Sequence, residues 1–77
     1  MRIISQDGWL DMPYESTTLM IDKQGNIYLI VAILNSKSMK IIARYSDESK
    51  AKKAMFYCLQ SFRNGNKYYY FPEDEEQ

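Results

Sequence analysis

The segment 26–34 constrains the fold more than any other part of the chain, because both of its alternating sets of side chains are apolar. Successive residues of a β-strand point to opposite faces of a sheet, so a strand of this kind must be buried on both faces. The two sets are Ile27, Leu29, Val31 and Ile33 on one side and Tyr28, Ile30, Ala32 and Leu34 on the other. One covering layer can bury only one of these faces.

Further strands are expected on both sides of this segment. β-Branched and aromatic residues predict a hairpin in which 17–21 pairs with 26–34 across an Asp-Lys-Gln-Gly turn. The alternation of polar and apolar residues predicts a third strand at 39–45. Short strands are expected at 2–5 and at the Tyr-rich 67–71. The segment 9–12, before Pro13, is an edge strand or an irregular loop, because proline lacks the ladder donor.

A single helix is expected from about 47 to 64. Ser46 offers a capping hydroxyl at its start, and Gly65 supplies a helix stop at its end. Between them, apolar residues recur at helical spacing along one stripe: Ala51, Ala54, Met55, Cys58, Leu59 and Phe62.

These elements predict an α+β fold, with one antiparallel sheet of four to five strands in the order β-β-β-β-α-β and the helix (about 47–64) packed on one face. Residues 1–72 would form a single domain, and the acidic residues 73–77 a disordered tail. The second face of the central strand would be covered by segment 9–14, by curling of the sheet, or by another chain. A homo-oligomer, most simply a dimer, is therefore expected.

Composition excludes several classes of function. The ten basic residues balance the ten acidic ones, so no overall field favours nucleic acid, and broad nucleic-acid binding is not expected. The chain has no His, no glycine-rich phosphate loop and no nucleophile motif, so we expect neither an enzyme nor a bound cofactor or metal. Cys58 is interpreted as a buried small apolar residue in a reducing cytosol. The longest apolar run, 27–34, is too short to cross a bilayer, so a cytoplasmic location is expected.

The candidate binding residues come from the first sixteen positions, where turn formers, the single Trp and an aromatic-acidic pair occur together. They are Arg2, Asp7, Trp9, Tyr14 and Glu15. The aromatic rings could stack a base or anchor a protein partner, and Arg2 could meet a phosphate. The alternative is that most rings belong to the core and that the carboxylates are solvated turn and cap residues, since their spacing fits no metal loop.

Two stretches carry a resemblance to a known group. The start Met-Arg-Ile-Ile-Ser-Gln-Asp-Gly with Pro13-Tyr14-Glu15, and the run Ala43-Arg44-Tyr45-Ser46 leading into Lys50 to Met55, cover most of the chain. They resemble a group of small uncharacterised proteins carried by Gram-positive bacteria, their phages and prophages. The resemblance implies an accessory protein of a mobile element and supplies no catalytic residues.

The expected function is therefore stoichiometric binding by a non-enzymatic phage or mobile-element accessory protein. One form is inhibition of a host protein, such as a protein of host defence. A second form is a sponge that sequesters a nucleotide-derived immune signal. A third is a structural or regulatory subunit of a phage assembly.

Overall fold

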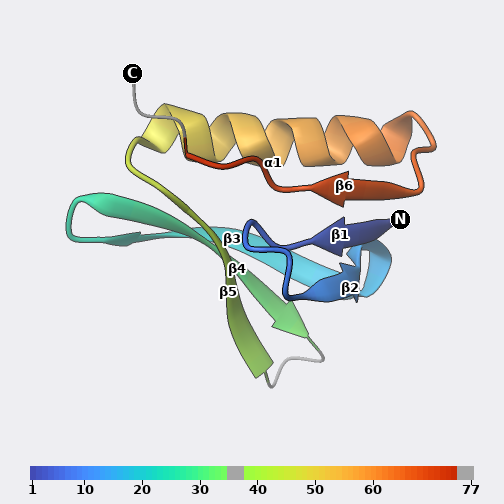
Figure 1. Cartoon of the computed structure of the whole chain (residues 1–77), viewed down its shortest axis with the longest axis horizontal. Coiled ribbons are helices and arrows are strands. Elements are labelled where there is room, and N and C mark those ends of the chain that lie inside the picture. The colour runs from blue at the N-terminus through green and yellow to red at the C-terminus, as the bar shows by residue number, and fades with distance from the viewer. Residues whose placement is uncertain (35–37, 75–77) are drawn as a thin grey trace.

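The computed structural model describes residues 1–34 and 38–74. Within these ranges it contains one α-helix, one short 3-10 turn and six strands, arranged as two three-stranded sheets (Figure 1). The elements are β1 (Arg2–Ile4), β2 (Asp11–Pro13), η1 (Tyr14–Ser16), β3 (Thr17–Gln24), β4 (Ile27–Leu34), β5 (Ser38–Tyr45), α1 (Glu48–Arg63) and β6 (Tyr68–Tyr70). The α+β class is confirmed, whereas the expectation of one sheet with four to five strands is wrong.

The larger sheet is an antiparallel meander in the order β3-β4-β5. β3 runs three residues further than expected, because Asp22, Lys23 and Gln24 continue the pairing up to Ile27. The turn is then closed by Gly25, whose φ of 61° lies in the left-handed region that glycine tolerates. β4 is the central strand of this sheet, as its two apolar faces predict.

The smaller sheet has the order β2-β1-β6 and mixes two kinds of pairing. β1 pairs with β2 as an antiparallel hairpin, and it pairs with β6 in parallel, Ile3 lying opposite Tyr69. The sequence predicted a wholly antiparallel sheet. The parallel pair arises because α1 lies between β5 and β6 and returns the chain to the far edge of β1, in the direction of β1 itself.

Gln6 connects the two sheets. Its backbone N–H donates to the Ile42 carbonyl at 2.7 Å, and its side-chain oxygen accepts from the Arg44 N–H at 2.9 Å. Its amide nitrogen donates to the carbonyls of Arg44 and Pro72. The pairing of β4 with β5 shifts register between Ile30 and Val31, so that Ile42 has no partner on β4. This bulge turns the Ile42 side chain into the core.

The core lies between α1, the small sheet and one face of the meander, called here the inner face. In Figure 1, α1 and β6 run side by side, and the long strands of the meander cross beneath them. The buried cluster takes residues from each of these layers: Ile3, Met12, Ile30, Ala32, Ile42, Ala43, Tyr45, Ala51, Ala54, Cys58 and Phe71. The inner face of β4 is thereby covered.

The helix packs with only part of the expected stripe. Ala51, Ala54 and Cys58 are buried, whereas Leu59 and Phe62 are each about 40% exposed. The helix also begins at a different cap, since Asp47 takes the N-cap position and its carboxylate accepts from the Ser49 N–H at 2.7 Å. The expected stop is confirmed, because Gly65 follows the helix with a φ of 77°.

Asp74, the second residue of the expected acidic tail, has partners. The Asp74 carboxylate accepts from the Ser46 N–H at 3.1 Å and lies 3.2 Å from the Lys50 ammonium. Residues 75–77 of the tail expected at 73–77 lie outside the described residues.

Candidate functional site

The turn from Ser5 to Leu10 closes the hairpin of β1 and β2 and presents Trp9 to solvent. Two backbone hydrogen bonds close it, from Ser5 N–H to the Leu10 carbonyl and from Gly8 N–H to the Ser5 carbonyl, each 2.9 Å. The Ser5 hydroxyl donates to the Asp7 carboxylate at 2.6 Å and accepts from the Leu10 N–H at 3.0 Å. The Trp9 N–H donates to the same Asp7 oxygen at 3.0 Å. The backbone that carries Trp9 is therefore held from both sides.

Asp7 works as an ionised acceptor in this turn. The hydrogen bond from the Ser5 hydroxyl, and after it the one from the Trp9 N–H, holds the pKa of the Asp7 carboxyl below its ordinary value of 3.8. Because hydrogen bonds to a carboxylate are stronger than those to a neutral oxygen, the turn is tightest when Asp7 is charged. Asp7 is therefore a positioning residue for Trp9.

The Trp9 side chain is 85% exposed, the largest exposure among the described large apolar residues. A shallow hollow of about 260 Å³ adjoins the turn where Gln6 and Asp7 meet β5, and Ile41 to Arg44 form its other wall. Asp7, the exposed residue Ile41 and Arg44 of β5 are among the residues that line this hollow. The turn thus combines a projecting indole with a recess beside it.

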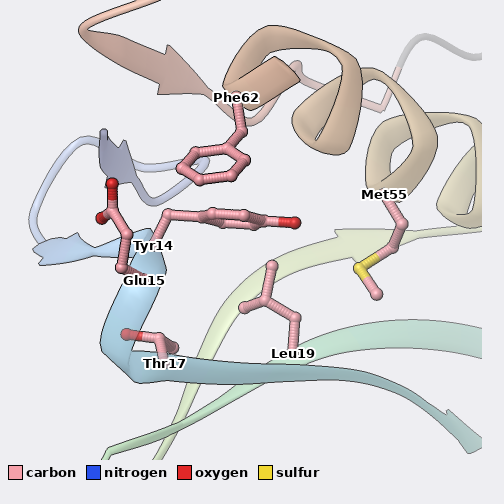
Figure 2. A pocket seen from close by; sticks show the side chains of 6 residues that line it. All are labelled: Tyr14, Glu15, Thr17, Leu19, Met55 and Phe62. Atoms are coloured by element: carbon pink, nitrogen blue, oxygen red, sulfur yellow. The ribbon is translucent and has the colours of Figure 1, made fainter. Parts of the chain in front are cut away.

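Tyr14 and Glu15 lie at the other end of the same hairpin, in a cleft of about 430 Å³ between η1, β3 and α1 (Figure 2). The Tyr14 and Phe62 rings pack with centroids 5.0 Å apart, and the Tyr14 hydroxyl points toward Met55. Burial raises the pKa of the Tyr14 phenol. The Tyr14 ring is therefore partly engaged in packing against Phe62.

The Glu15 carboxylate points away from the middle of this cleft in Figure 2. It accepts a hydrogen bond from the N-terminal ammonium of Met1 at 2.6 Å. That hydrogen bond lowers the pKa of the Glu15 carboxyl. The cleft thus has an apolar wall and an acidic side chain that already has a cationic partner.

Arg2 is the first residue of β1 and pairs with Pro13 near the Tyr14 end of the hairpin, where its Nε is 2.8 Å from the Asp11 carboxylate. The five candidate residues therefore divide into three places. Asp7 and Trp9 share the turn, Tyr14 and Glu15 share the cleft, and Arg2 pairs with Asp11. Among the described residues, no group of three or more His, Cys, Asp or Glu could hold a metal ion.

Cys58 is fully buried on the core-facing side of α1. Burial raises the pKa of its thiol to about 12, so it is protonated at neutral pH. No helix in ranges 1–34 and 38–74 is long and apolar enough to cross a membrane.

Sequence reasoning did not select two exposed rings of the small sheet. Tyr68 and Tyr70 are about 60% exposed and pack edge to face with centroids 5.7 Å apart. They share the outward face of that sheet with Arg2 and Ile4, while Tyr69 points to the core. The alternation within 68–71 predicts that these rings lie on two faces of the strand. It does not show which of the two faces is exposed.

Comparisons of the chain with protein-family models, with curated proteins and with solved structures found no match.

Proposed function

We propose that this protein acts by stoichiometric binding of another protein, with Trp9 as the anchor of the contact. The observation that carries the proposal is a tryptophan with 85% of its side chain exposed on a turn held by backbone and side-chain hydrogen bonds. Exposed tryptophans of this kind dominate the binding energy of many protein interfaces once a partner's pocket encloses them.

The rigidity of the turn is the second support. Binding costs free energy for every side chain and loop that must be ordered, so a turn that is already fixed loses less on association. The Ser5 and Asp7 hydrogen bonds fix the Trp9 backbone before any partner arrives. The recess beside the turn would accept a side chain of the partner next to Gln6 and Asp7.

The geometry gives less support to a nucleotide sponge. A nucleotide site needs a stacking ring and a phosphate-binding cation within a few ångströms of each other. Here Trp9 and Tyr14 lie at opposite ends of the hairpin, and the Arg2 guanidinium is engaged by Asp11. Protein binding, in contrast, needs one complementary surface.

The partner class follows from the resemblance to small phage and prophage proteins. We propose a protein of the bacterial host, with inhibition of host defence as the role. A homodimer, which the two-sided central strand predicts, would present two Trp9 turns and could engage a symmetric host protein. A subunit role in a phage assembly would use the same anchor.

The test is affinity purification of the tagged full-length chain from a Gram-positive host, with quantitative mass spectrometry of the retained proteins. We compare the natural chain with Trp9→Ala and with the control Phe56→Ala, which removes another exposed ring, 52% exposed on α1. A partner enriched by the natural chain and by Phe56→Ala, but reduced at least about tenfold by Trp9→Ala, supports the proposal.

Equal retention by Trp9→Ala would contradict the proposal, provided that circular dichroism shows an unchanged fold. Native mass spectrometry of the same preparation provides a second readout. A nucleotide-sized adduct in place of a protein partner would favour the sponge.

A further inference from the structure

The outer face of the meander is apolar and uncovered. It is the face opposite to the core, and the strand registers place seven apolar side chains on it: Met20, Ile27, Leu29, Val31, Ile33, Met39 and Ile41. Met20, Met39 and Ile41 are 41%, 64% and 58% exposed. Leu29 and Val31 at the centre are only 7% and 3% exposed, although they do not belong to the core cluster.

No described element lies over this face. α1 and the small sheet both pack against the inner face, and Met12, the buried residue of segment 9–14, belongs to the core on that side. Of the three covers that the sequence left open for the second face of the central strand, segment 9–14 is therefore wrong. The face is instead a shallow hollow of about 450 Å³ that reaches from Asp22 and Gln24 to Ile41 and Arg44.

Two opposite charges flank the apolar centre in a single row. Asp22 on β3, Leu29 on β4 and Arg44 on β5 are direct cross-strand neighbours, so their side chains point to the same face. Asp22 and Arg44 are two strand spacings apart, so their Cα atoms are separated by roughly 10 Å. Neither side chain forms an ion pair with another residue of the described part of the chain.

We propose that this face binds a second copy of the chain, with a two-fold axis parallel to β4. Rotation about such an axis places β3 of each copy over β5 of the other, and β4 over β4. Asp22 then faces Arg44 of the second copy, and the reverse contact forms at the other edge. The same rotation sets Met20 over Ile41, and it aligns Leu29 and Val31 with their own copies.

The alternative two-fold axis, across the strands, gives no such match. It would place β3 over β3 and exchange the two halves of each strand about the centre of the face. Asp22 would then lie over Met20, and Arg44 over Ile41, so both charges would be desolvated against apolar side chains without a partner. Charge complementarity therefore selects the axis parallel to β4.

The size of the face suits a dimer of moderate affinity. Three strands of eight residues cover a footprint of roughly 14 by 26 Å. Two such faces packed about 10 Å apart bury on the order of 1,000 Å² in total, near the lower limit of specific interfaces. We therefore expect a dimer that dissociates on dilution through roughly the micromolar range.

The test is sedimentation velocity of the full-length chain at concentrations from about 1 to 500 μM, with five variants. Asp22→Arg and Arg44→Asp each place like charges together twice per dimer. The double variant Asp22→Arg with Arg44→Asp restores opposite charges. Phe56→Ser is the matched control, because it removes an exposed ring from α1, which packs on the inner face.

We expect each single charge variant to raise the dissociation constant at least about tenfold and the double variant to return it to within about threefold. Phe56→Ser should leave it unchanged. Ile41→Asp, at a half-exposed position, should give a folded monomer. A natural chain that stays monomeric throughout would overturn the proposal and assign the face to a different protein. The axis parallel to β4 would be overturned if neither single charge variant raised the dissociation constant of the dimer. It would also be overturned if the double variant did not restore that constant.

Discussion

Ser5 is the buried polar side chain of the described core, at 3% exposure, and its hydroxyl is fully used. Its hydrogen bonds tie the end of β1 to Asp7 and Leu10. A buried hydroxyl without partners would destabilise the fold, whereas here it organises a turn of six residues. The exposure of Trp9 thus depends on a buried serine and on the charge of one carboxylate.

The charge of Asp7 makes the turn sensitive to acid. Because the folded-state pKa is lowered, the stabilisation is fully present above the unfolded-state value near 3.8 and is lost as the pH falls through the folded-state pKa. Asp7→Asn should lower the melting temperature at pH 7, since a neutral oxygen is the weaker acceptor. The difference from the natural chain should shrink as the pH falls below the ordinary value of 3.8, as measured by thermal unfolding followed by circular dichroism. A difference that is independent of pH would contradict the assigned role.

Ser46 and Asp47, at the start of α1, make different hydrogen bonds. Asp47 caps the helix, while Ser46 precedes it and donates its backbone N–H to the Asp74 carboxylate. The Ser46 hydroxyl lies 3.4 Å from Asp74, at the long limit of a hydrogen bond. Both residue types favour the N-cap, so the sequence pattern alone could not assign the cap.

Removing the cap should therefore matter more than removing the hydroxyl before it. Asp47→Ala should lower the free energy of unfolding by about 1 kcal/mol, because the Ser49 N–H loses its acceptor at the positive end of the helix dipole. Ser46→Ala is the matched variant and should cost less than about 0.5 kcal/mol. Urea unfolding followed by circular dichroism distinguishes the two. If Ser46→Ala lowered the free energy of unfolding more than Asp47→Ala, Ser46 would be the capping residue.

The molecule as a whole is held together by contacts between segments distant in sequence. β1 pairs with β6 across more than sixty residues, and Gln6 joins the first hairpin to β5 and to Pro72. The Tyr45 hydroxyl also donates to the Pro72 carbonyl at 2.6 Å. The small sheet is thereby fixed against the meander near the Trp9 turn.

Gln6→Ala should destabilise the whole domain by about 1–2 kcal/mol, because the backbone groups of Arg44 and Pro72 lose their side-chain partner. Gln24→Ala is the matched control, since the Gln24 amide bonds only to Asp22, two residues away, among the described contacts. Urea unfolding of both variants should show a lower midpoint for Gln6→Ala alone. Equal midpoints would show that the two sheets are held together without Gln6.

The local elements could be inferred from the chain pattern because their causes are local. Residues 27–34 are β-branched and apolar on both faces, and the helix is bounded by capping residues and Gly65. Of the candidate site, turn chemistry placed Asp7 in a turn, whereas Trp9 was expected in the edge strand or irregular loop that follows it. These patterns could not show that Tyr14 packs on Phe62, or that Arg2 and Glu15 each have an ionic partner.

The division into two sheets depends on long-range pairing. A three-residue strand such as β1 carries too few side chains to specify its neighbour or direction, and the parallel partner β6 becomes available only after α1 has packed. The uncovered outer face has a similar origin. The sequence required two covers for β4, and the tertiary structure placed α1 and the small sheet on the same side, because Ile3, Met12, Cys58 and Phe71 share one core.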